Sequence, residues 1–524
     1  MATVNQAIER LFPNSVILDY EDGEKVFAKS KSQMTYRDMA VELQLHEDSE
    51  GHPSIKVFVT SEKTPIRSLK LVWQREIGAY CRFTGDEWGA SNGTSQWRGM
   101  DPQRIFPWYV LVRANEETIA MGVMTQCASF ASWNLNPSQV TLSLDLRNGS
   151  NGVCLNGRVL EATTILYCRY ERTPFAAARK FCKILSPLAI TPSLPVYGIL
   201  SRPHAGQPFG AEQILKECTE LSILSNNLQN RPFQIVDCGW QTEDINSNAS
   251  CGPWTTPSKR FGDMADLADK IRRQGIRPGL SMRLLCDRSD TLPAEWHIEG
   301  KSDILDPSQP QVLEYIQGNV RQAADWGYEL FRHIGSTTDC LNGVFNSQYA
   351  RERWHFADQS KTNAEILMDF YHAIKSAMGD MFIYGEDVIG HLGAGLLHLN
   401  RASMDAPEND WQRNRHNRIN TLAFRICQNE NFFTIDPGPI DLGANQKWQD
   451  LRQLAELTSL SGSAFIVSID TQKPLPPACA KDLARDFLNA SFGSYQLYSQ
   501  DWLTNTCPEE WSLDGETRKY HWFS

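Results

Sequence analysis

The sequence predicts a multidomain protein: an N-terminal antiparallel β-sandwich, then a (β/α)8 TIM barrel and a small C-terminal β appendage. A chain of 524 residues is longer than one ordinary domain. Short runs with alternating apolar and polar residues fill the first third, and eight strand-and-helix repeats fill most of the rest. A doubly wound open sheet is the alternative, but no GxGxxG motif follows the first strand of the repeats.

The segment 1–172 is predicted to be the sandwich. Runs such as IKVFVTS, LKLVWQREI, TIAMGVMTQ and QVTLSLDLRN alternate in the manner of half-buried strands, and Asn, Gly, Asp and Pro separate them. Between two runs, Gly85–Gly99 is a long polar loop with aromatic residues, which predicts an exposed connection or a lid that reaches another domain. Residues 173–195 form a linker, in which a helix capped by Thr173 precedes a Pro-rich stretch.

The segment 196–491 is predicted to be the barrel, because strand-like and helix-like runs alternate through it. The predicted strands lie within 196–201, 233–240, 276–285, 328–334, 381–387, 396–405, 431–436 and 464–468. The predicted helices span 210–226, 261–275, 310–327, 361–379, 411–426, 445–462 and 476–491. Residues 492–524 are too few for a large domain and are expected to form the β appendage.

Composition excludes several classes of function. The net charge of -11 has no basic stripe, so no nucleic-acid partner is expected. The N-terminus lacks the apolar core of a secretion signal, and no apolar run is long enough to cross a membrane. Thirteen scattered cysteines favour reduced thiols in a cytoplasmic protein over a disulfide framework. No Cys or His spacing suits zinc, and neither a metal nor a cofactor is predicted.

Polar residues gather where the predicted strands end, which is where a barrel of this kind places its active site. Asp or Arg occurs at most of the eight strand ends, more often than helix capping alone would require. Carboxylates and guanidinium groups together with Trp suit a neutral polyhydroxylated ligand. The side chains at these ends include Asp237, Cys238, Trp240, Arg283, Arg332, His333, Glu386, Asp387, Arg401, Asp405, Asp436, Ser468 and Asp470.

The chain resembles the α-galactosidase-type, melibiase-like glycosidases of glycoside hydrolase family 36. The family patterns LGDxWERxYGDLEWRG, DDGWQ, PGLWxRPL and WGYELIKHDFSTYDIFG correspond here to FTGDEWGASNGTSQWRG, VDCGWQ, PGLSMRLL and WGYELFRHIGSTTDCLNG. Two further patterns, GCNTIGHLxAGLFExQRTGDDTSG and NTLAFRMPQHxxFFxxDAD, correspond to GEDVIGHLGAGLLHLNRASMDAPEND and NTLAFRICQNENFFTIDPG. The resemblance runs from about residue 80 to 470, in the order of the predicted strands.

The resemblance implies roles for individual residues. It makes Asp405 the general acid/base, on an RxxxD pattern that starts at Arg401, and Arg332 replaces a Lys that contacts the sugar. Asp405 has the alternative of capping the helix that begins near Trp411, and His333 is either a substrate contact or a core residue. The expected sugar-binding set is Asp237, Trp240, Arg283, Arg332, His333, Arg401, Trp411 and Asp436.

The chain departs from the family where the chemistry should lie. Ile334 occupies the position of the nucleophilic Asp, Cys238 that of the second Asp of DDGW, and Gly89 that of the Glu of WER. Glu386 and Asp387 replace the Cys-Asn pair. The second catalytic carboxylate is therefore expected to have moved, to Glu386, Asp387 or Asp339. A carboxylate about 5 Å from Asp405 would act as a nucleophile, with retention of the anomeric configuration. A distance of roughly 6.5–9.5 Å would leave room for a water molecule and give inversion of that configuration. Relocation of the second carboxylate favours the longer distance and therefore inversion.

Three functions remain open. The first is a glycosidase that acts on α-linked, galactose-like sugars through Asp405 and a relocated carboxylate. The second is a non-catalytic carbohydrate-binding protein on a glycosidase scaffold. The third is a transglycosylase or an isomerase-like enzyme. A carbohydrate is the expected partner in the first two, and homo-oligomerisation is left open.

Overall fold

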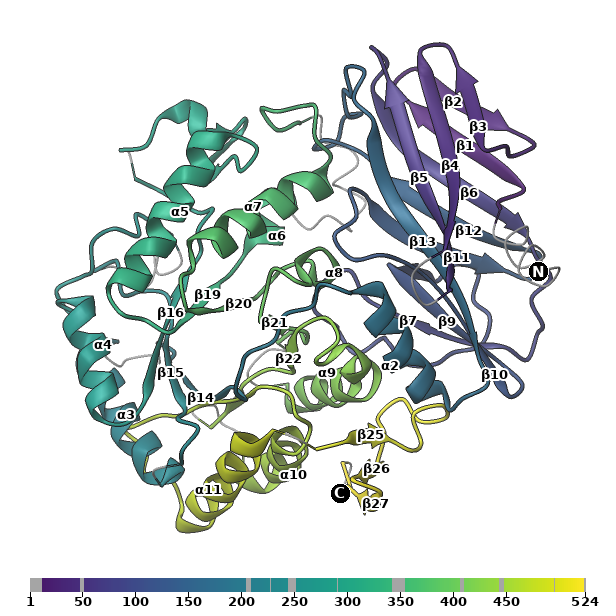
Figure 1. Ribbon diagram of the computed structural model, residues 1–524. Helices are drawn as coiled ribbons and strands as arrows, with labels where there is room; N and C mark the ends of the chain where they lie inside the picture. Colours follow the sequence, from purple (N-terminus) through teal and green to yellow (C-terminus); the bar gives the residue numbers. More distant parts are fainter. Residues whose placement is uncertain are drawn as a thin grey trace.

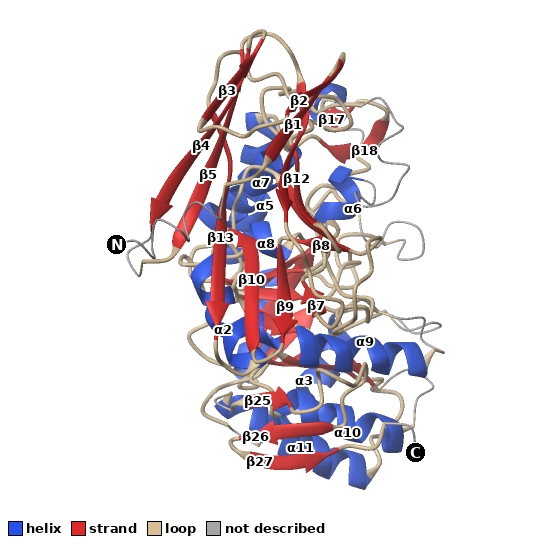
Figure 2. Cartoon of the chain, turned by 90° about the vertical axis from the view of Figure 1, so that its right-hand side faces the viewer, coloured by secondary structure: helices blue, strands red, loops and turns tan. Residues whose placement is uncertain are grey.

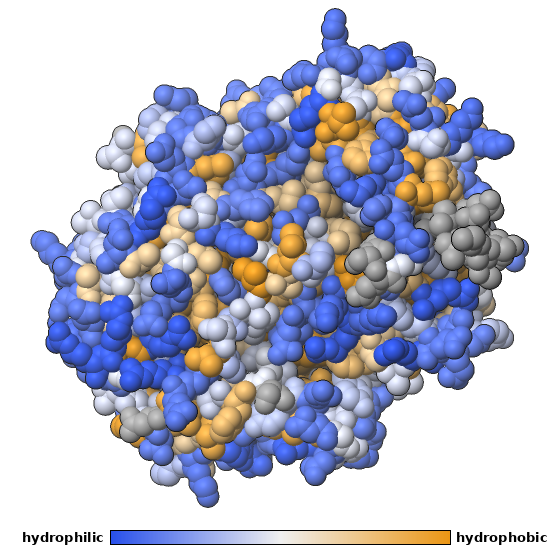
Figure 3. Space-filling model, viewed as in Figure 1, coloured by the Kyte–Doolittle hydropathy of each residue, from blue (hydrophilic) through white to orange (hydrophobic). Residues whose placement is uncertain are grey.

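The computed structural model describes residues 12–47, 51–203, 209–226, 228–243, 251–289, 291–341, 354–405, 410–442, 447–493 and 495–522. Figure 1 shows the N-terminal strands, purple to blue, beside a region of alternating strands and helices, teal to yellow. The face seen in Figure 3 is mostly polar, with apolar side chains in separate small groups. None of the helices in the described ranges is long and apolar enough to cross a membrane.

The N-terminal region consists of two antiparallel sheets. The six-stranded sheet has the order β2 (Gly23–Phe27), β1 (Ser15–Tyr20), β6 (Ile66–Gln74), β12 (Gln139–Asp145), β11 (Phe130–Asn136) and β8 (Ile105–Pro107). The seven-stranded sheet has the order β3 (Gln33–Tyr36), β4 (Met39–Glu47), β5 (Pro53–Ser61), β13 (Leu160–Tyr170), β10 (Glu117–Val123), β9 (Tyr109–Ala114) and β7 (Arg82–Gly85). The predicted antiparallel strands of this segment are confirmed.

Sequence alternation decides which side of each strand is buried. Val140, Leu142 and Leu144 of β12 are buried while the residues between them are half-buried, as the period of two requires. The same alternation in β1 buries Val16 and Leu18. The apolar faces of the two sheets contribute to one continuous hydrophobic core.

Helix α2 (Pro174–Leu185) follows the two sheets. The Thr173 side chain accepts a hydrogen bond from the Ala176 amide, and Pro174 occupies the first turn, as expected of a helix start. The buried face of α2 packs against β10 and the short 3-10 helix η2 (Ile426–Gln428). The segment expected to be a linker is therefore packed against both the N-terminal sheets and the C-terminal half of the chain.

The second half of the chain forms a nine-stranded parallel sheet, with helices along its outer side (Figure 1). Its strands follow the order β22 (Thr434–Asp436), β21 (Leu399–Arg401), β20 (Phe382–Gly385), β19 (Leu330–His333), β16 (Arg277–Met282), β15 (Phe233–Val236), β14 (Tyr197–Leu200), β24 (Phe465–Ser468) and β23 (Ile440–Asp441). The long helices are α3 (Ala211–Ser225), α4 (Met264–Arg273), α5 (Pro310–Asp325), α7 (Asn363–Ala377), α9 (Trp411–Phe424), α10 (Trp448–Ser459) and α11 (Pro477–Phe492). The predicted alternation of strands and helices is confirmed.

The seventh predicted strand contains β22, and a further short strand, β23, follows it outside the predicted range. β22 pairs with β21, whereas β23 pairs with β24 at the other end of the strand order. Pro437 and Pro439 lie between them and cannot donate backbone hydrogen bonds. The amide of Ala464 donates to the carbonyl of Ile435 at 2.8 Å. The two ends of the sheet are therefore joined through this segment, and the sheet curls.

Several short elements lie outside the predicted set. They are η1 (Ala294–Trp296), β17 (His297–Ile298), β18 (Lys301–Leu305), α6 (Ser336–Leu341) and α8 (Gly390–Gly393). The C-terminal segment forms an antiparallel sheet of β25 (Leu497–Ser499), β26 (Glu510–Leu513) and β27 (Glu516–Lys519), as expected (Figure 2). Beside it, Trp502 contacts Trp97, Phe175 and Phe424, so four distant parts of the sequence meet there.

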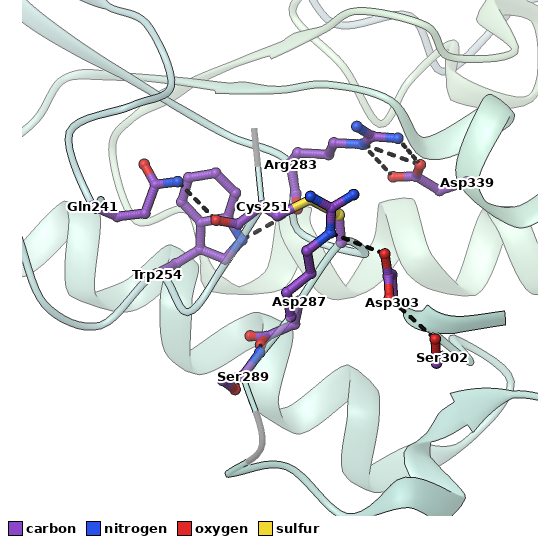
Figure 4. Close-up of a disulfide and its surroundings, with 11 residues drawn as sticks. Gln241, Cys251, Trp254, Arg283, Asp287, Ser289, Ser302, Asp303 and Asp339 are labelled. Carbon is purple, nitrogen blue, oxygen red and sulfur yellow. Dashed lines mark hydrogen bonds and ion pairs between the residues drawn. A yellow bond between two sulfur atoms is a disulfide. The ribbon is translucent and has the colours of Figure 1, made fainter. Parts of the chain in front are cut away.

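Cys251 and Cys286 form a disulfide between the loops that follow β15 and β16 (Figure 4). The prediction of reduced thiols is wrong for this pair, and the other eleven cysteines are free. The pairing joins residues 35 positions apart, and only the parallel arrangement of the two strands brings these loops together.

The long polar loop 85–99 reaches the second half of the chain, as the lid alternative predicted. Asp86 forms a buried ion pair with Arg425, at 2.9 Å, directly after α9. The Ser91 amide donates to the Ala402 carbonyl at 2.7 Å, and the Met404 amide donates to the Ser91 carbonyl at 2.8 Å. The loop therefore fixes the backbone that follows β21.

We predict that Asp86→Ala lowers the free energy of unfolding by about 3–5 kcal/mol, because Arg425 would remain buried without its counter-charge. The matched control is Glu117→Ala, which removes the exposed ion pair with Arg169 and should cost less than about 1 kcal/mol. Urea denaturation measures both values. Equal losses in the two variants would contradict the importance of the buried pair.

Candidate active site

Charged side chains converge at the carboxyl edge of the parallel sheet. Arg332 is the third residue of β19, and Arg401 is the last residue of β21. Both arginines are only 3% exposed. A buried guanidinium group requires negative partners, and these come from the ends of the neighbouring strands.

Arg332 links the ends of β15 and β20. One of its terminal nitrogens lies 2.8 Å from Asp237 and 3.0 Å from the hydroxyl of Ser281. The other terminal nitrogen lies 2.5 Å from Glu386. Arg332 therefore holds two of the predicted site carboxylates on either side of β19.

Arg401 continues the same network toward β21. Its terminal nitrogens lie 3.2 Å from Asp436, 3.9 Å from Glu386 and 2.5 Å from Asp405. Glu386 thus lies between two guanidinium groups. The resulting row of alternating charges extends from Asp237 to Asp405.

Asp405 is the most exposed carboxylate of the row, with 43% of its side chain accessible to solvent. Besides Arg401, it approaches Arg202 at 3.4 Å and Arg418 at 4.0 Å. Partial burial acts to raise the pKa of Asp405, but the three arginines outweigh it and hold the pKa well below its usual value. Asp405 is therefore ionised at neutral pH and cannot serve as a proton donor there.

Asp405 does not cap α9. The side chain of Asp410 performs that function and accepts a hydrogen bond from the Arg413 amide at 2.9 Å. The capping alternative for Asp405 is therefore wrong, and its carboxylate belongs to the charged row.

Glu386 and Asp387 are adjacent but have opposite pKa shifts. Burial acts to raise the pKa of Glu386, and Arg332 and Arg401 reverse this effect and lower it. Burial raises the pKa of Asp387 to about 6, although its carboxylate accepts a hydrogen bond from the Thr338 amide at 2.9 Å. Asp387 has a φ of 55°, in the left-handed region that few residues other than Gly adopt. This backbone conformation follows directly after Glu386.

Asp339 lies on α6 and pairs with Arg283 through both carboxylate oxygens (Figure 4). Burial raises the pKa of Asp339, and Arg283 partly opposes the shift. Both residues line a cavity of about 430 Å³ that also includes Arg288, Lys301 and Asp303. The fourth candidate carboxylate therefore lies at this cavity, bound to its own arginine.

Three predicted sugar-binding residues lie in the core instead of at an open site. Trp240 is fully buried, donates its indole N–H to the Ser281 carbonyl and packs against Trp254. His333 is also fully buried and contacts the ring of Phe370, which corresponds to the core alternative. Burial and the charge of Arg332 lower the pKa of this histidine to about 3.

Asp436 is the third of these buried residues. Its carboxylate accepts hydrogen bonds from the hydroxyl of Tyr384 and from Arg401. Asp436 therefore helps to fix the position of the Arg401 side chain. Trp411, a half-buried residue at the start of α9, lines a separate cavity with Gln449 and His521.

Ile334 and Cys238 stand where the family resemblance led us to expect carboxylates. The Ile334 amide donates to the carbonyl of Met282 at 3.1 Å, which continues the pairing of β19 with β16, and its partly buried side chain packs against the core. Cys238 is a buried free thiol, and burial raises its pKa well above the usual value. Neither side chain supplies a negative charge to the site.

Arg202, Arg418, Ser281 and Tyr384 also belong to this network, although they were not among the predicted site residues. Arg202 comes two residues after the end of β14, so its position near a strand end was a usable signal. Arg418 lies within α9, where no strand-end pattern could indicate it. Within the described part of the chain, no cluster of His, Cys, Asp and Glu could hold a metal ion.

Comparison of the sequence with protein-family models gave no match. Comparison with curated proteins gave none either.

Comparison with solved structures gave many matches. An α-galactosidase from Thermus thermophilus, in complex with p-nitrophenyl α-D-galactopyranoside, has a TM-score of 0.60 at 15% identity, covering 94% of this chain and 99% of the other. The family 36 α-galactosidase AgaA from Geobacillus stearothermophilus has a TM-score of 0.62 at 11% identity, covering 95% and 79%. An α-N-acetylgalactosaminidase from Bifidobacterium bifidum has a TM-score of 0.58 at 11% identity, covering 96% and 92%.

At identities this low, structural likeness is evidence about the fold. The matches extend over nearly the whole chain and include both the N-terminal sheets and the parallel sheet. The chain has the fold of the α-galactosidase-like glycoside hydrolases of family 36.

Proposed function

We propose that this chain is a glycoside hydrolase that acts on α-linked, galactose-like sugars. The observation that carries the proposal is the placement of two ionised carboxylates, Glu386 and Asp405, on the buried Arg401, with Asp387, whose pKa is raised to about 6, next to Glu386 at the carboxyl edge of the sheet. Hydrolases of this class use paired carboxyl groups, and this edge is where a barrel enzyme binds its substrate. Structural neighbours solved with stachyose and with a nitrophenyl galactoside support this choice of sugar.

The proposal includes the domain organisation. A β-sandwich of residues 1–172 and a packed linker of residues 173–195 precede a (β/α)8 barrel of residues 196–491. The pairing of β22 with β21 and of β23 with β24 supports a closed barrel. Residues 492–524 form the β appendage.

The three carboxylates have different proposed roles. Asp387 is the general acid, because a pKa of about 6 keeps it mostly protonated below that pH and about one-tenth protonated at pH 7. Asp405 is the base that activates water, because it is ionised and is the carboxylate of the row most accessible to solvent. Glu386, held by Arg332 and Arg401, stabilises positive charge that develops on the sugar ring.

The positions of these groups favour inversion of the anomeric centre. Asp387 accepts a hydrogen bond from α6, which follows β19, whereas Asp405 pairs with arginines of β21 and of the segment after β14. The proposed spacing between the Asp387 and Asp405 carboxylates is therefore the wider one of roughly 6.5–9.5 Å, which leaves room for the attacking water.

A non-catalytic sugar-binding protein is the second candidate. Ile334 in the position of the family nucleophile favours it, as does the ion pairing of both Asp237 and Glu386 with Arg332. Asp237 and Arg332 would then still offer hydrogen bonds to sugar hydroxyls. This candidate predicts that galactose raises the melting temperature while no glycoside is hydrolysed.

We predict that Asp387→Asn reduces hydrolysis of alkyl α-galactosides by roughly 10²–10⁴-fold. Hydrolysis of p-nitrophenyl α-galactoside should fall much less, because nitrophenolate leaves without a proton. Steady-state kcat/KM values for the two substrates measure the difference. Equal losses on both substrates would assign Asp387 another role.

We predict that Asp405→Asn reduces hydrolysis of both substrates by at least roughly 10²-fold, because activation of water is required whichever group leaves. The matched control is Asp269→Asn, which changes an exposed carboxylate on α4 and should retain wild-type kcat/KM. Melting temperatures of both variants show that each is folded. Wild-type activity of Asp405→Asn would exclude it as the base.

We predict that kcat/KM of the wild-type enzyme for alkyl α-galactosides falls as the pH rises above about 6. The pKa of Asp387 is raised to about 6, so its carboxyl group carries the catalytic proton below that pH and loses it above. The arginines keep Asp405 ionised well below this pH, so the acidic side of the profile should stay flat near pH 5. In Asp387→Asn the fall above pH 6 should disappear, and its persistence would contradict the assignment.

A further inference from the structure

A cavity of about 270 Å³ lies between the two N-terminal sheets, remote from the charged row. Trp73, Leu135 and Val140 line it from the six-stranded sheet, and Val112 and Met121 line it from the seven-stranded sheet. Figure 1 places these strands on the side of the molecule away from the middle of the parallel sheet. The cavity is therefore independent of the proposed sugar site.

The cavity exists because the side chains that face each other from the two sheets do not fill the space between Trp73 and Met121. Ile119, Met121 and Tyr167 point toward the facing sheet but stay only half-buried, whereas Leu142 and Leu144 farther along β12 are completely buried. Protein cores are normally packed without voids of this size. Side chains that face the core yet remain partly accessible show that the cavity opens to solvent.

The lining is apolar and partly aromatic. Trp73 and Trp133 stack at 5.9 Å between ring centroids, and Trp133 uses its indole N–H internally, as a donor to the Trp108 carbonyl. Polar side chains lie at the rim, where Arg75 and Glu76 carry opposite charges on an exposed segment. The walls thus match a hydrocarbon group, and the rim matches a polar, uncharged end of the same molecule.

The volume limits the size of the ligand. Apolar cavities of roughly 150 Å³ stay dry and bind benzene or xenon, so this larger cavity admits a substituted ring or a chain of about eight carbons. Ala114, at the end of β9, is a small residue in the lining, and its methyl group leaves space that a larger side chain would fill.

We propose that the inter-sheet cavity is a binding site for an uncharged amphiphile with an aromatic ring or a short alkyl chain, of which 1-octanol is the simplest probe. The hydrocarbon part lies between the paired indoles and the aliphatic residues of β9 and β10. The hydroxyl group lies at the rim beside Arg75 and Glu76.

The test is calorimetric titration of the full chain with 1-octanol, 1-butanol and glycerol. Saturable binding of 1-octanol, weaker binding of 1-butanol and no binding of glycerol are expected. Ala114→Phe and Val140→Phe fill the cavity from opposite sheets and should each weaken 1-octanol binding by roughly tenfold or more. Ile105→Phe enlarges an apolar residue on the exposed face of the six-stranded sheet and should leave binding unchanged.

Xenon-pressurised crystals of the wild-type protein locate the site without any substitution, which keeps the proposal testable if a filling variant does not fold. Xenon between Trp73 and Met121 is the expected result. Undetectable binding of 1-octanol, or equal binding by the wild type, both filling variants and Ile105→Phe, would overturn the proposal. An empty cavity in the xenon crystals would also overturn it.

Discussion

Two buried guanidinium groups, those of Arg332 and Arg401, are the constraint on which the site depends. Each is almost completely removed from water, and an unpaired charge there would carry a large desolvation penalty. The carboxylates of Asp237, Glu386 and Asp405 meet this requirement, and each comes from or follows a different strand. The parallel sheet places these strand ends side by side, so the fold and the charged row stabilise each other.

The N-terminal region contributes to the same edge of the sheet. Loop 85–99 forms hydrogen bonds with the backbone on both sides of Ser403, which lies two residues before Asp405. In the same loop, Asp86 neutralises the charge of the buried Arg425. The Arg425 side chain also donates to the carbonyls of Gly89 and Ala402. The position of Asp405 therefore depends on a loop more than three hundred residues away in sequence, which explains why the N-terminal sheets pack against the strand-and-helix region.

Much of the fold could be predicted from the sequence because hydrophobic periodicity marks strands and helices directly. The strand–helix alternation and the antiparallel N-terminal strands follow from that periodicity. The separation of β22 from β23 does not, because it depends on which neighbour each strand pairs with. The disulfide between Cys251 and Cys286 depends in the same way on two loops meeting in space.

The site was predicted less completely. Charge at a strand end indicated Arg332, Glu386 and Arg401, but a strand end does not show whether a side chain faces the site or the helices outside. Successive side chains of a strand point to opposite faces, so His333 packs against α7 while Arg332 faces the site. Trp240 lies in the loop that follows β15, and its ring packs against the indole rings of Trp254 and Trp326 instead of facing the charged row.

In the proposed function, the carboxylates around Arg332 and Arg401 hydrolyse α-galactosides with a general base that is not at the position of Ile334. Proton NMR of the anomeric signals during hydrolysis of p-nitrophenyl α-galactoside reveals the stereochemistry of this reaction. We expect β-galactose to appear first and the α-anomer to follow only by mutarotation. Release of α-galactose as the first product would contradict the inverting arrangement, and no release of galactose would contradict hydrolysis itself.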